Sequence, residues 1–178
     1  IEFDNCVCAL PPQVLAQMLP PDSPLRKNIE KIKTTDIVNV YFTTREKLAD
    51  GSYACLVGSP LHWIFDHTEK SEKCRTENLR LYGATISDSA IQPNPDEIAK
   101  ILSDETARMF GKCTIVDILP SKFAGATISG DCQTESLRPR DGDTGAEKLY
   151  ICGDWVATGL PCTMESAAKS VNDMAIFK

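Results

Sequence analysis

An unbroken apolar run near the end of the chain predicts a buried strand followed by a turn and a helix. Residues 149–152 (LYIC) show no alternation, which is typical of a strand covered on both faces. Gly153 and Asp154 follow at once, and the compact stretch 157–161 (ATGLP) leads to Thr163, which is suited to cap a helix. Apolar residues at helical spacing then predict the buried stripe of that helix: Met164, Ala167, Ala168, Val171, Met174 and Ala175.

Further apolar runs predict strands along the rest of the chain. Residues 1–10 are apolar on both faces and stop at two prolines, so a second buried strand is expected there. The turn signal Asp50-Gly51 predicts a hairpin that pairs residues 37–42 with residues 53–57. In residues 79–86 the alternation of Leu79, Leu81 and Gly83 against Arg80 and Tyr82 predicts one solvated face. Two more strands are expected, over residues 62–65 and 113–119.

Local signals also place the helices and the irregular segments. The clearest helix start is Asn94-Pro95-Asp96-Glu97, where the Asn caps, the Pro suits the first helical position and the Glu can bond back to the cap. Gly111 is expected to end this helix. Short helices are expected over residues 13–19 and 25–32. Residues 67–77 are predicted to form an exposed loop, and residues 121–130 an irregular connection. The polar residues 135–147 are predicted to form an excursion on the surface.

The order of these elements predicts an α/β fold with an inserted α+β lobe. The first and last strands would share a sheet in one domain, formed by residues 1–12 and 124–178, while residues 13–123 would form a lobe with an antiparallel sheet. The chain opens directly in an apolar strand without an initiator Met. We therefore expect it to be the C-terminal piece of a longer polypeptide.

Composition narrows the class of protein. The chain of 178 residues is 42% hydrophobic and 25% charged, which is ordinary for a folded globular protein. Its net charge of -6 argues against a nucleic-acid footprint, which needs a basic face. It has no apolar run of ~18 residues and no recognisable signal peptide, so we expect a cytoplasmic protein.

The eight cysteines are expected to be reduced. Most of them lie within apolar runs and resemble small hydrophobic residues there. A chain of this length does not need disulfides for stability. No CxxC motif occurs and only two histidines are present, so the sequence predicts no metal site.

The stretch that begins at residue 149 also carries the candidate chemistry. A helix N-terminus presents free N–H groups and the positive end of a dipole, and an adjacent acid accepts hydrogen bonds from hydroxyl groups. Together they predict a site for a ligand with hydroxyls and negative charge. Alternative roles remain open: Asp154 as a turn residue, Glu165 as a favourable acid in the first helical turn, and Trp155 as a packing residue.

Residues 153–165 (GDWVATGLPCTME) resemble the C-terminal FAD-binding motif of the flavin-dependent amine oxidoreductases. Within that superfamily the sequence is most similar to the squalene-associated desaturase branch, the hydroxysqualene dehydroxylases, and next to the phytoene and carotene desaturases. Three further features are similar to other parts of the same families: residues 9–12, residues 37–40 together with residues 63–66, and Arg138-Pro139. Ser166 and Val171 depart from the pattern, since Gly is frequent at both places.

The resemblance implies the C-terminal part of a two-domain, FAD-binding, amine-oxidase-like fold that lacks its N-terminal dinucleotide-binding half, since no G-x-G-x-x-G is present. Asp154 would hydrogen-bond the ribityl or phosphate side of FAD, and the backbone at Thr163, Met164 and Glu165 would face the N1–C2=O edge of the flavin. The full cofactor-binding set implied is Gly153, Asp154, Thr163, Met164 and Glu165. The substrate cavity would be lined by Trp155, Ala157, Thr158, Gly159, Leu160 and Pro161.

The resemblance also implies an FAD-dependent oxidoreductase that acts on an isoprenoid lipid. The reaction would be hydroxysqualene dehydroxylation or carotenoid-type desaturation, by hydride transfer at the flavin N5, and no catalytic residue is singled out. The expected partners are the lipid substrate, the missing N-terminal half and a membrane surface. A different class stays open: a non-catalytic fragment, or a subunit that binds FAD only with a separate N-terminal chain. A plain α/β binding domain without cofactor is a third possibility.

Overall fold

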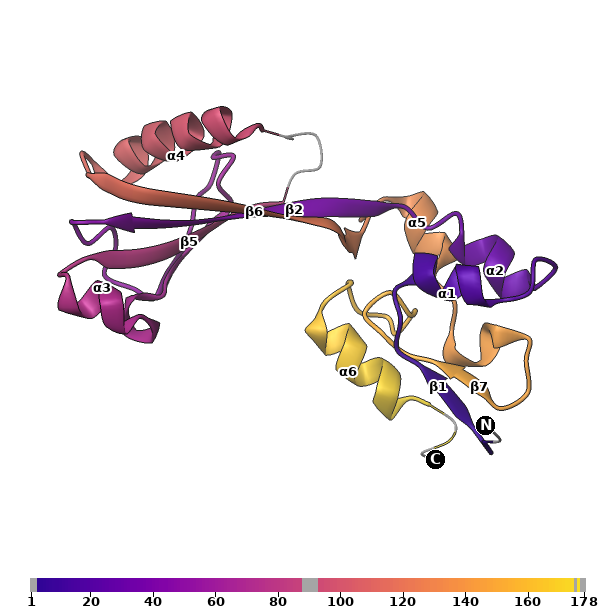
Figure 1. The fold of residues 1–178 in the computed structure, drawn as a ribbon. Coiled ribbons are helices and arrows are strands. Elements are labelled where there is room, and N and C mark those ends of the chain that lie inside the picture. Colours follow the sequence, from indigo (N-terminus) through magenta and orange to yellow (C-terminus); the bar gives the residue numbers. More distant parts are fainter. Residues whose placement is uncertain (1–2, 88–92, 175, 177–178) are drawn as a thin grey trace. The chain divides into compact units, whose positions relative to one another are not determined.

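The protein is described by a computed structural model over residues 3–87, 93–174 and 176. The chain separates into two compact units, one formed by residues 1–34 with 127–178 and the other by residues 35–126 (Figure 1). The sequence-based division assigned residues 13–33 to the middle lobe, whereas these residues belong to the first unit in the structure. Each unit has its own hydrophobic core.

The first unit contains a parallel pair of strands, β1 (Cys6–Cys8) and β7 (Leu149–Ile151). The prediction that the first and last strands share a sheet is confirmed, with Cys6 paired to Leu149 and Cys8 to Ile151. Strand β1 is shorter than expected, and Val7 on it is 44% exposed, so only one of its faces is covered by the core. Residues 1–2 of the expected strand lie outside the described part of the chain.

Helices surround this pair of strands and complete the core of the first unit. Helices α1 (Pro12–Met18) and α2 (Pro24–Ile29) lie close to the predicted positions, while α5 (Cys132–Leu137) and the short 3-10 helix η2 (Asp141–Thr144) fall within the predicted surface excursion or beside it. Helix α6 (Met164–Asn172) follows β7. The core residues are Cys8, Leu15, Ala16, Leu25, Ile29, Ile32, Ile128, Ile151, Trp155 and Val156.

The second unit is built on a five-stranded sheet with the order β3-β4-β5-β2-β6. Its strands are β2 (Thr34–Thr44), β3 (Tyr53–Cys55), β4 (Trp63–Asp66), β5 (Arg80–Ile86) and β6 (Ile115–Ile128). The pairs β3–β4, β4–β5 and β5–β2 are antiparallel.

The predicted hairpin between residues 37–42, now part of β2, and residues 53–57, which include β3, is wrong. Strand β2 pairs with β5, so that Val40 lies opposite Ala84, and β3 pairs with β4 instead. The connection after β2 is held by a contact distant in sequence, because the backbone N–H of Leu48 donates to the Tyr82 hydroxyl at 3.0 Å. Tyr82 is only 2% exposed because it packs in the core of this unit, so it does not lie on a solvated face as predicted.

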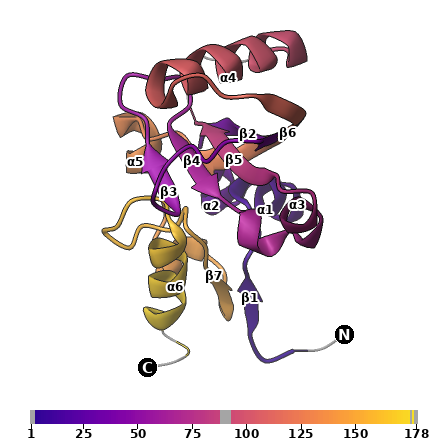
Figure 2. The same ribbon diagram turned by 90° about the vertical axis from the view of Figure 1, so that its left-hand side faces the viewer.

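Helix α4 (Pro95–Phe110) lies along one face of the sheet, as Figures 1 and 2 show. The predicted capping box is confirmed: the Asn94 side chain accepts from the Glu97 N–H at 3.0 Å, and the Glu97 carboxylate accepts from the Asn94 N–H at 2.8 Å. Gly111 ends the helix with a φ of 83°. The helix contributes Ile98 and Leu102 to a core that also contains Val38, Val40, Phe42, Ile64, Tyr82, Ala84 and Ile86.

Two further predictions for this part of the chain are wrong. The expected loop over residues 67–77 contains the 3-10 helix η1 (Thr68–Lys70) and the short helix α3 (Glu72–Thr76). Ser71 caps α3 and Cys74 is buried beneath it, so this charged sequence has a covered side. The expected irregular connection after residue 120 continues as β6 to Ile128, because the strand has β2 as its neighbour in the sheet.

Candidate functional site

The turn after β7 requires glycine at its first position. Gly153 has a φ of 143°, and a Cβ built there would lie 2.9 Å from Trp155 Nε1. The indole of Trp155 is 2% exposed and its Nε1 donates to the Leu10 carbonyl at 3.0 Å. The Gly153 N–H donates to the Ser170 hydroxyl at 2.9 Å. The turn is therefore fixed both to the segment after β1 and to α6.

Asp154 lies at this turn with its side chain half-buried. Its Oδ2 accepts from the Cys162 thiol at 2.9 Å, and that sulfur also contacts the Thr127 hydroxyl at 3.3 Å. Burial, and next the hydrogen bond to Asp154, raise the pKa of the Cys162 thiol, so the thiol stays protonated and can donate. Within the described residues, Oδ2 is the carboxylate oxygen with a hydrogen-bond partner, which leaves Oδ1 available to a ligand.

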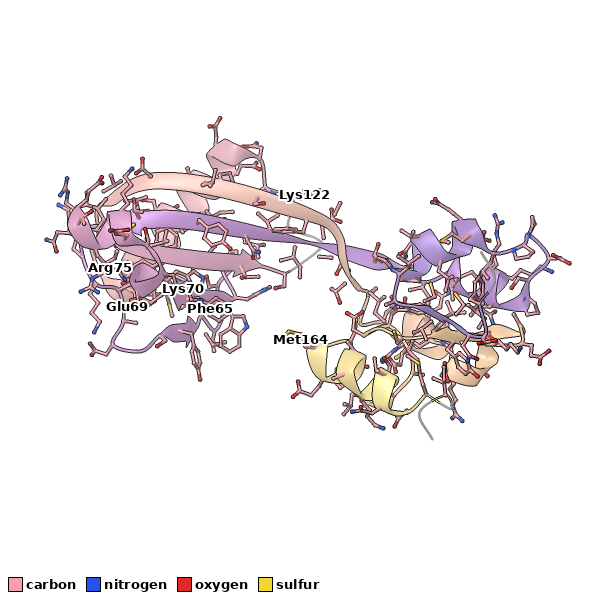
Figure 3. The ribbon with its side chains drawn as sticks, turned by 60° about the horizontal axis from the view of Figure 1, so that its bottom comes forward. Phe65, Glu69, Lys70, Arg75, Lys122 and Met164 are labelled. Atoms are coloured by element: carbon pink, nitrogen blue, oxygen red, sulfur yellow. The ribbon has the colours of Figure 1, made fainter. Side chains whose placement is uncertain are left out.

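Helix α6 begins at this site with unsatisfied backbone donors. The Thr163 hydroxyl accepts from the Ser166 N–H at 3.5 Å, and the Thr163 carbonyl accepts from the Ala167 N–H at 3.0 Å. In the described part of the chain the N–H groups of Met164 and Glu165, which precede these, have no acceptor. The Met164 side chain is 88% exposed and projects from the helix start in Figure 3.

The buried face of α6 differs from the prediction. Ser166 and Ser170 are 0% and 1% exposed, whereas Met164 and Val171 of the predicted apolar stripe are exposed. Met174, just after the helix, is buried as predicted, and Ala175 lies outside the described residues. The reason is that α6 packs on the preceding loop through hydroxyl groups: Thr158 and Ser166 share a hydrogen bond of 2.7 Å.

The loop between the turn and α6 is held by Arg138, a residue that the sequence-based description placed on the surface. The Arg138 side chain is 1% exposed. Its guanidinium donates to four backbone carbonyls of the loop: Asp154 at 3.0 Å, Trp155 at 3.3 Å, Val156 at 2.7 Å and Leu160 at 3.0 Å. A loop without regular structure has carbonyls that need partners when buried, and an arginine supplies five N–H donors.

Two further side chains complete the surroundings of Arg138. Its guanidinium pairs with the exposed carboxylate of Glu135 at 2.9 Å and donates to the Ser166 hydroxyl at 3.3 Å. Ser166, which departs from the family pattern, is therefore turned into the loop rather than toward the free end of α6. The sequence signal for Arg138 was its similarity to the Arg-Pro of the desaturases.

The loop borders two hollows in the first unit. One is a cavity of about 470 Å³, lined by residues 140–142, residues 156–158, Ser170 and Asp173. The other has about 360 Å³ and is lined by residues 128–130, Glu135 and residues 159–162. Of the predicted substrate-cavity residues, Ala157 and Thr158 line the first hollow, and Gly159, Leu160 and Pro161 line the second. The buried Trp155 lines neither.

Comparison with known proteins assigns this architecture to a class. The family model of the flavin containing amine oxidoreductases matches residues 1–171, and the chain belongs to that family. The predictions of the family, of the fold class and of FAD as the cofactor are confirmed.

The chain is also similar to individual curated proteins, which are hydroxysqualene dehydroxylases. The chain is 25% identical over 178 residues to a hydroxysqualene dehydroxylase of Sinorhizobium fredii, and 24% identical over 172 residues to one of Zymomonas mobilis. These alignments cover 97% and 94% of the chain. The chain spans 38% and 37% of the length of these two curated relatives.

Solved structures share the fold. An oxidoreductase from Methanosarcina mazei aligns with a TM-score of 0.64 at 12% identity, covering 97% of this chain and 42% of that one. A reduced UDP-galactopyranose mutase aligns with a TM-score of 0.63 at 10% identity, covering 87% of this chain and 37% of that one. At this identity the likeness concerns the fold alone.

Within the described residues, every helix is too short or too polar to cross a bilayer.

Proposed function

We propose that the first unit holds one side of FAD at the turn of Gly153 and Asp154 and at the start of α6. Three observations support the fit of the residues to this cofactor. The turn has no room for a Cβ at Gly153, Oδ1 of Asp154 is available, and the N–H groups of Met164 and Glu165 are unsatisfied within the described chain. These groups match a ligand that carries both hydroxyls and a region of negative charge.

Each of these groups has a distinct task in the proposal. Oδ1 of Asp154 accepts from a hydroxyl of the cofactor, while the Cys162 thiol holds the other carboxylate oxygen at 2.9 Å. The N–H groups at the start of α6, with the positive end of the helix dipole, stabilise negative charge on a flavin ring. When bound, FAD supplies hydride transfer at its N5 position.

We further propose an isoprenoid lipid as the substrate. Support comes from the relatives, which are named hydroxysqualene dehydroxylases, and the proposed reaction is dehydroxylation or desaturation of such a lipid. Residues 157–161 would border the substrate, and the second unit would form the substrate-binding lobe. Because lipids of this kind reside in membranes, contact with a membrane surface belongs to the same proposal.

The alternative is that the chain binds FAD only together with a dinucleotide-binding half. The test is the visible flavin absorbance of the purified chain, alone and after co-expression with the N-terminal half of a homologous dehydroxylase. Stoichiometric flavin in the chain alone contradicts the alternative, and flavin only in the co-expressed pair supports it. Absence of flavin from both preparations contradicts the proposed function.

Two variants test whether the Asp154 side chain contributes to FAD binding. Asp154→Ala is expected to lower the affinity for FAD about tenfold, since a hydrogen bond to a charged group contributes on the order of 1.5 kcal/mol. Asp22→Ala is the matched control, because Asp22 is exposed in the same unit. Equal FAD affinity in the two variants would exclude Asp154 from the site.

A further inference from the structure

A row of aromatic side chains lies on one face of the sheet in the second unit. Neighbouring ring centroids along it are 6.1 to 6.3 Å apart. Tyr53 is 65% exposed, Trp63 and Tyr41 are each 39% exposed, and Phe65 is 38% exposed. This aromatic row consists, in order, of Tyr53, Trp63, Phe65, His67 and Tyr41.

The alternation of the strands explains why these rings are exposed. Ile64, between Trp63 and Phe65 on β4, is 3% exposed and packs in the core that α4 covers. Its two neighbours therefore point to the opposite face, and Figure 3 shows Phe65 projecting from the sheet. Large aromatic side chains in a contiguous exposed row are typical of a binding surface rather than of an ordinary protein surface.

The row ends in a small pocket that the sequence creates with a glycine. The pocket has about 160 Å³ and is lined by Tyr41, Phe65 and His67, with Gly83 at its floor. A Cβ at Gly83 would lie 3.1 Å from His67 Nε2 and 3.3 Å from Tyr41 Cε1, so glycine is what lets these two rings lie close to the sheet. Phe65 and His67 stack at an interplanar angle of 17°.

The side chains that line the pocket do not favour a charged ligand. The Thr85 hydroxyl donates to Asn39 Oδ1 at 3.1 Å, so the polar lining side chains of Asn39 and Thr85 are neutral and partly paired with each other. Burial lowers the pKa of His67, so its imidazole is neutral at pH 7. Within the described residues the lining contains no Asp, Glu, Lys or Arg. A charged ligand would lose its hydration there without compensation.

We propose that the aromatic row and its pocket bind an extended, unsaturated hydrocarbon chain of the isoprenoid type. A chain in this conformation can contact all five rings, whereas a compact ligand reaches one or two of them. A sugar would also stack on aromatic rings, but each of its hydroxyl groups needs a polar partner, and the non-aromatic polar side chains that line the pocket are those of Asn39 and Thr85. The identity of the chain as an isoprenoid rests on the proposed function, whereas its binding here requires no FAD.

The intrinsic fluorescence of the chain gives a direct test with farnesol as the probe. The protein has two tryptophans, and only Trp63 is exposed, since Trp155 is 2% exposed. Farnesol is expected to produce a saturable blue shift of the emission that disappears in Trp63→Phe. Dodecanol, a saturated alcohol with a chain of similar length, should bind more weakly.

Two phenylalanine substitutions test whether farnesol binds to the aromatic row or to any exposed apolar side chain. Phe65→Ala is expected to raise the Kd for farnesol about tenfold, as the loss of one large apolar contact implies. Phe123→Ala is the matched control: Phe123 is 51% exposed on β6 in the same sheet, outside the aromatic row, and its replacement should leave the Kd within about twofold. If Phe65→Ala fails to fold, Gly83→Ala fills the pocket floor and should also weaken binding.

Four outcomes would overturn the proposal. They are a farnesol response that does not saturate, equal affinity for dodecanol, equal loss of affinity in the Phe65 and Phe123 variants, and a blue shift that depends on protein concentration without farnesol. The last outcome would make a second copy of the chain the occupant of the aromatic row. Because the titration contains no FAD, its failure is distinguishable from a failure of the flavin absorbance test.

Discussion

The two units of this chain stabilise their candidate sites by opposite means. In the first unit, a loop without regular structure is held by the buried Arg138, which donates to four of its carbonyls. In the second unit, a regular sheet is held by an apolar core under α4, and its other face carries exposed aromatic rings. The polar network of the first unit presents oriented hydrogen-bond donors and acceptors, which suit a charged cofactor. The sheet of the second unit presents an apolar surface.

The largest effect is expected from removal of the charge that orders the loop. Arg138→Met leaves four loop carbonyls, two of them in buried hydrogen bonds, without their donor, which should lower the free energy of unfolding of the first unit by about 4 kcal/mol. Hydrogen exchange with mass spectrometry can measure this because it reports on peptides of each unit separately. The exposed neighbour Arg140 provides the control, and Arg140→Met should change stability by less than about 0.5 kcal/mol. Unchanged protection of residues 154–160 in Arg138→Met would refute the role given to Arg138.

The second unit should respond instead to the loss of apolar volume. Leu102 is 0% exposed in the core beneath α4, and Leu102→Ala should lower the free energy of unfolding of this unit by about 3 kcal/mol. The same exchange experiment should show the first unit unchanged. Leu119→Ala, at a position that is 67% exposed on β6, is the control and should be nearly neutral. Equal losses in both units would mean that they do not unfold separately.

A smaller effect is expected at the turn that carries Asp154. Gly153→Ala forces a side chain into a φ of 143° and against the Trp155 indole, which should cost about 2 kcal/mol. Gly142→Ala, in the same unit, has open space around its Cβ and should cost much less. Thermal unfolding of the two variants gives the comparison, and similar melting temperatures would contradict the constraint at Gly153.

The smallest effect concerns pH and the cap of α5. Hydrogen bonds from Ser129, first, and from the Thr134 backbone lower the pKa of Asp131 to about 2. Because the folded-state pKa lies below the unfolded value, the cap contributes stability above pH of about 4 and loses it as the pH falls toward 2. The stability difference between the wild type and Asp131→Ala should therefore shrink over that range. A difference that stays constant with pH would show that the carboxylate does not carry the cap.

Local signals in the sequence were sufficient for part of the fold. The cap of α4 was predictable because Asn94 and Glu97 are three residues apart and satisfy each other. The parallel pairing of β1 with β7 followed from two apolar runs of the kind buried in parallel sheets. The turn at Gly153 and the helix after Thr163 were likewise found from adjacent residues.

The rest depended on contacts between distant residues. Arg138 was placed on the surface because charged residues are rarely buried, and the four carbonyls that it binds follow 16 to 22 residues later in the chain. The buried face of α6 was missed because serines form it through hydroxyl bonds, which hydrophobic periodicity does not detect. The exposed aromatic row requires the pairing of β3 with β4, which the sequence analysis did not predict.

The most direct test of the central claim is an FAD titration of Asp154→Ala and Phe65→Ala, in the form of the protein that binds flavin. The polar site of the first unit and the apolar face of the second are proposed to bind different molecules. Asp154→Ala should therefore weaken FAD binding about tenfold while Phe65→Ala leaves it unchanged. An Asp154→Ala protein that binds FAD as tightly as the wild type, or equal losses in the two variants, would contradict the account.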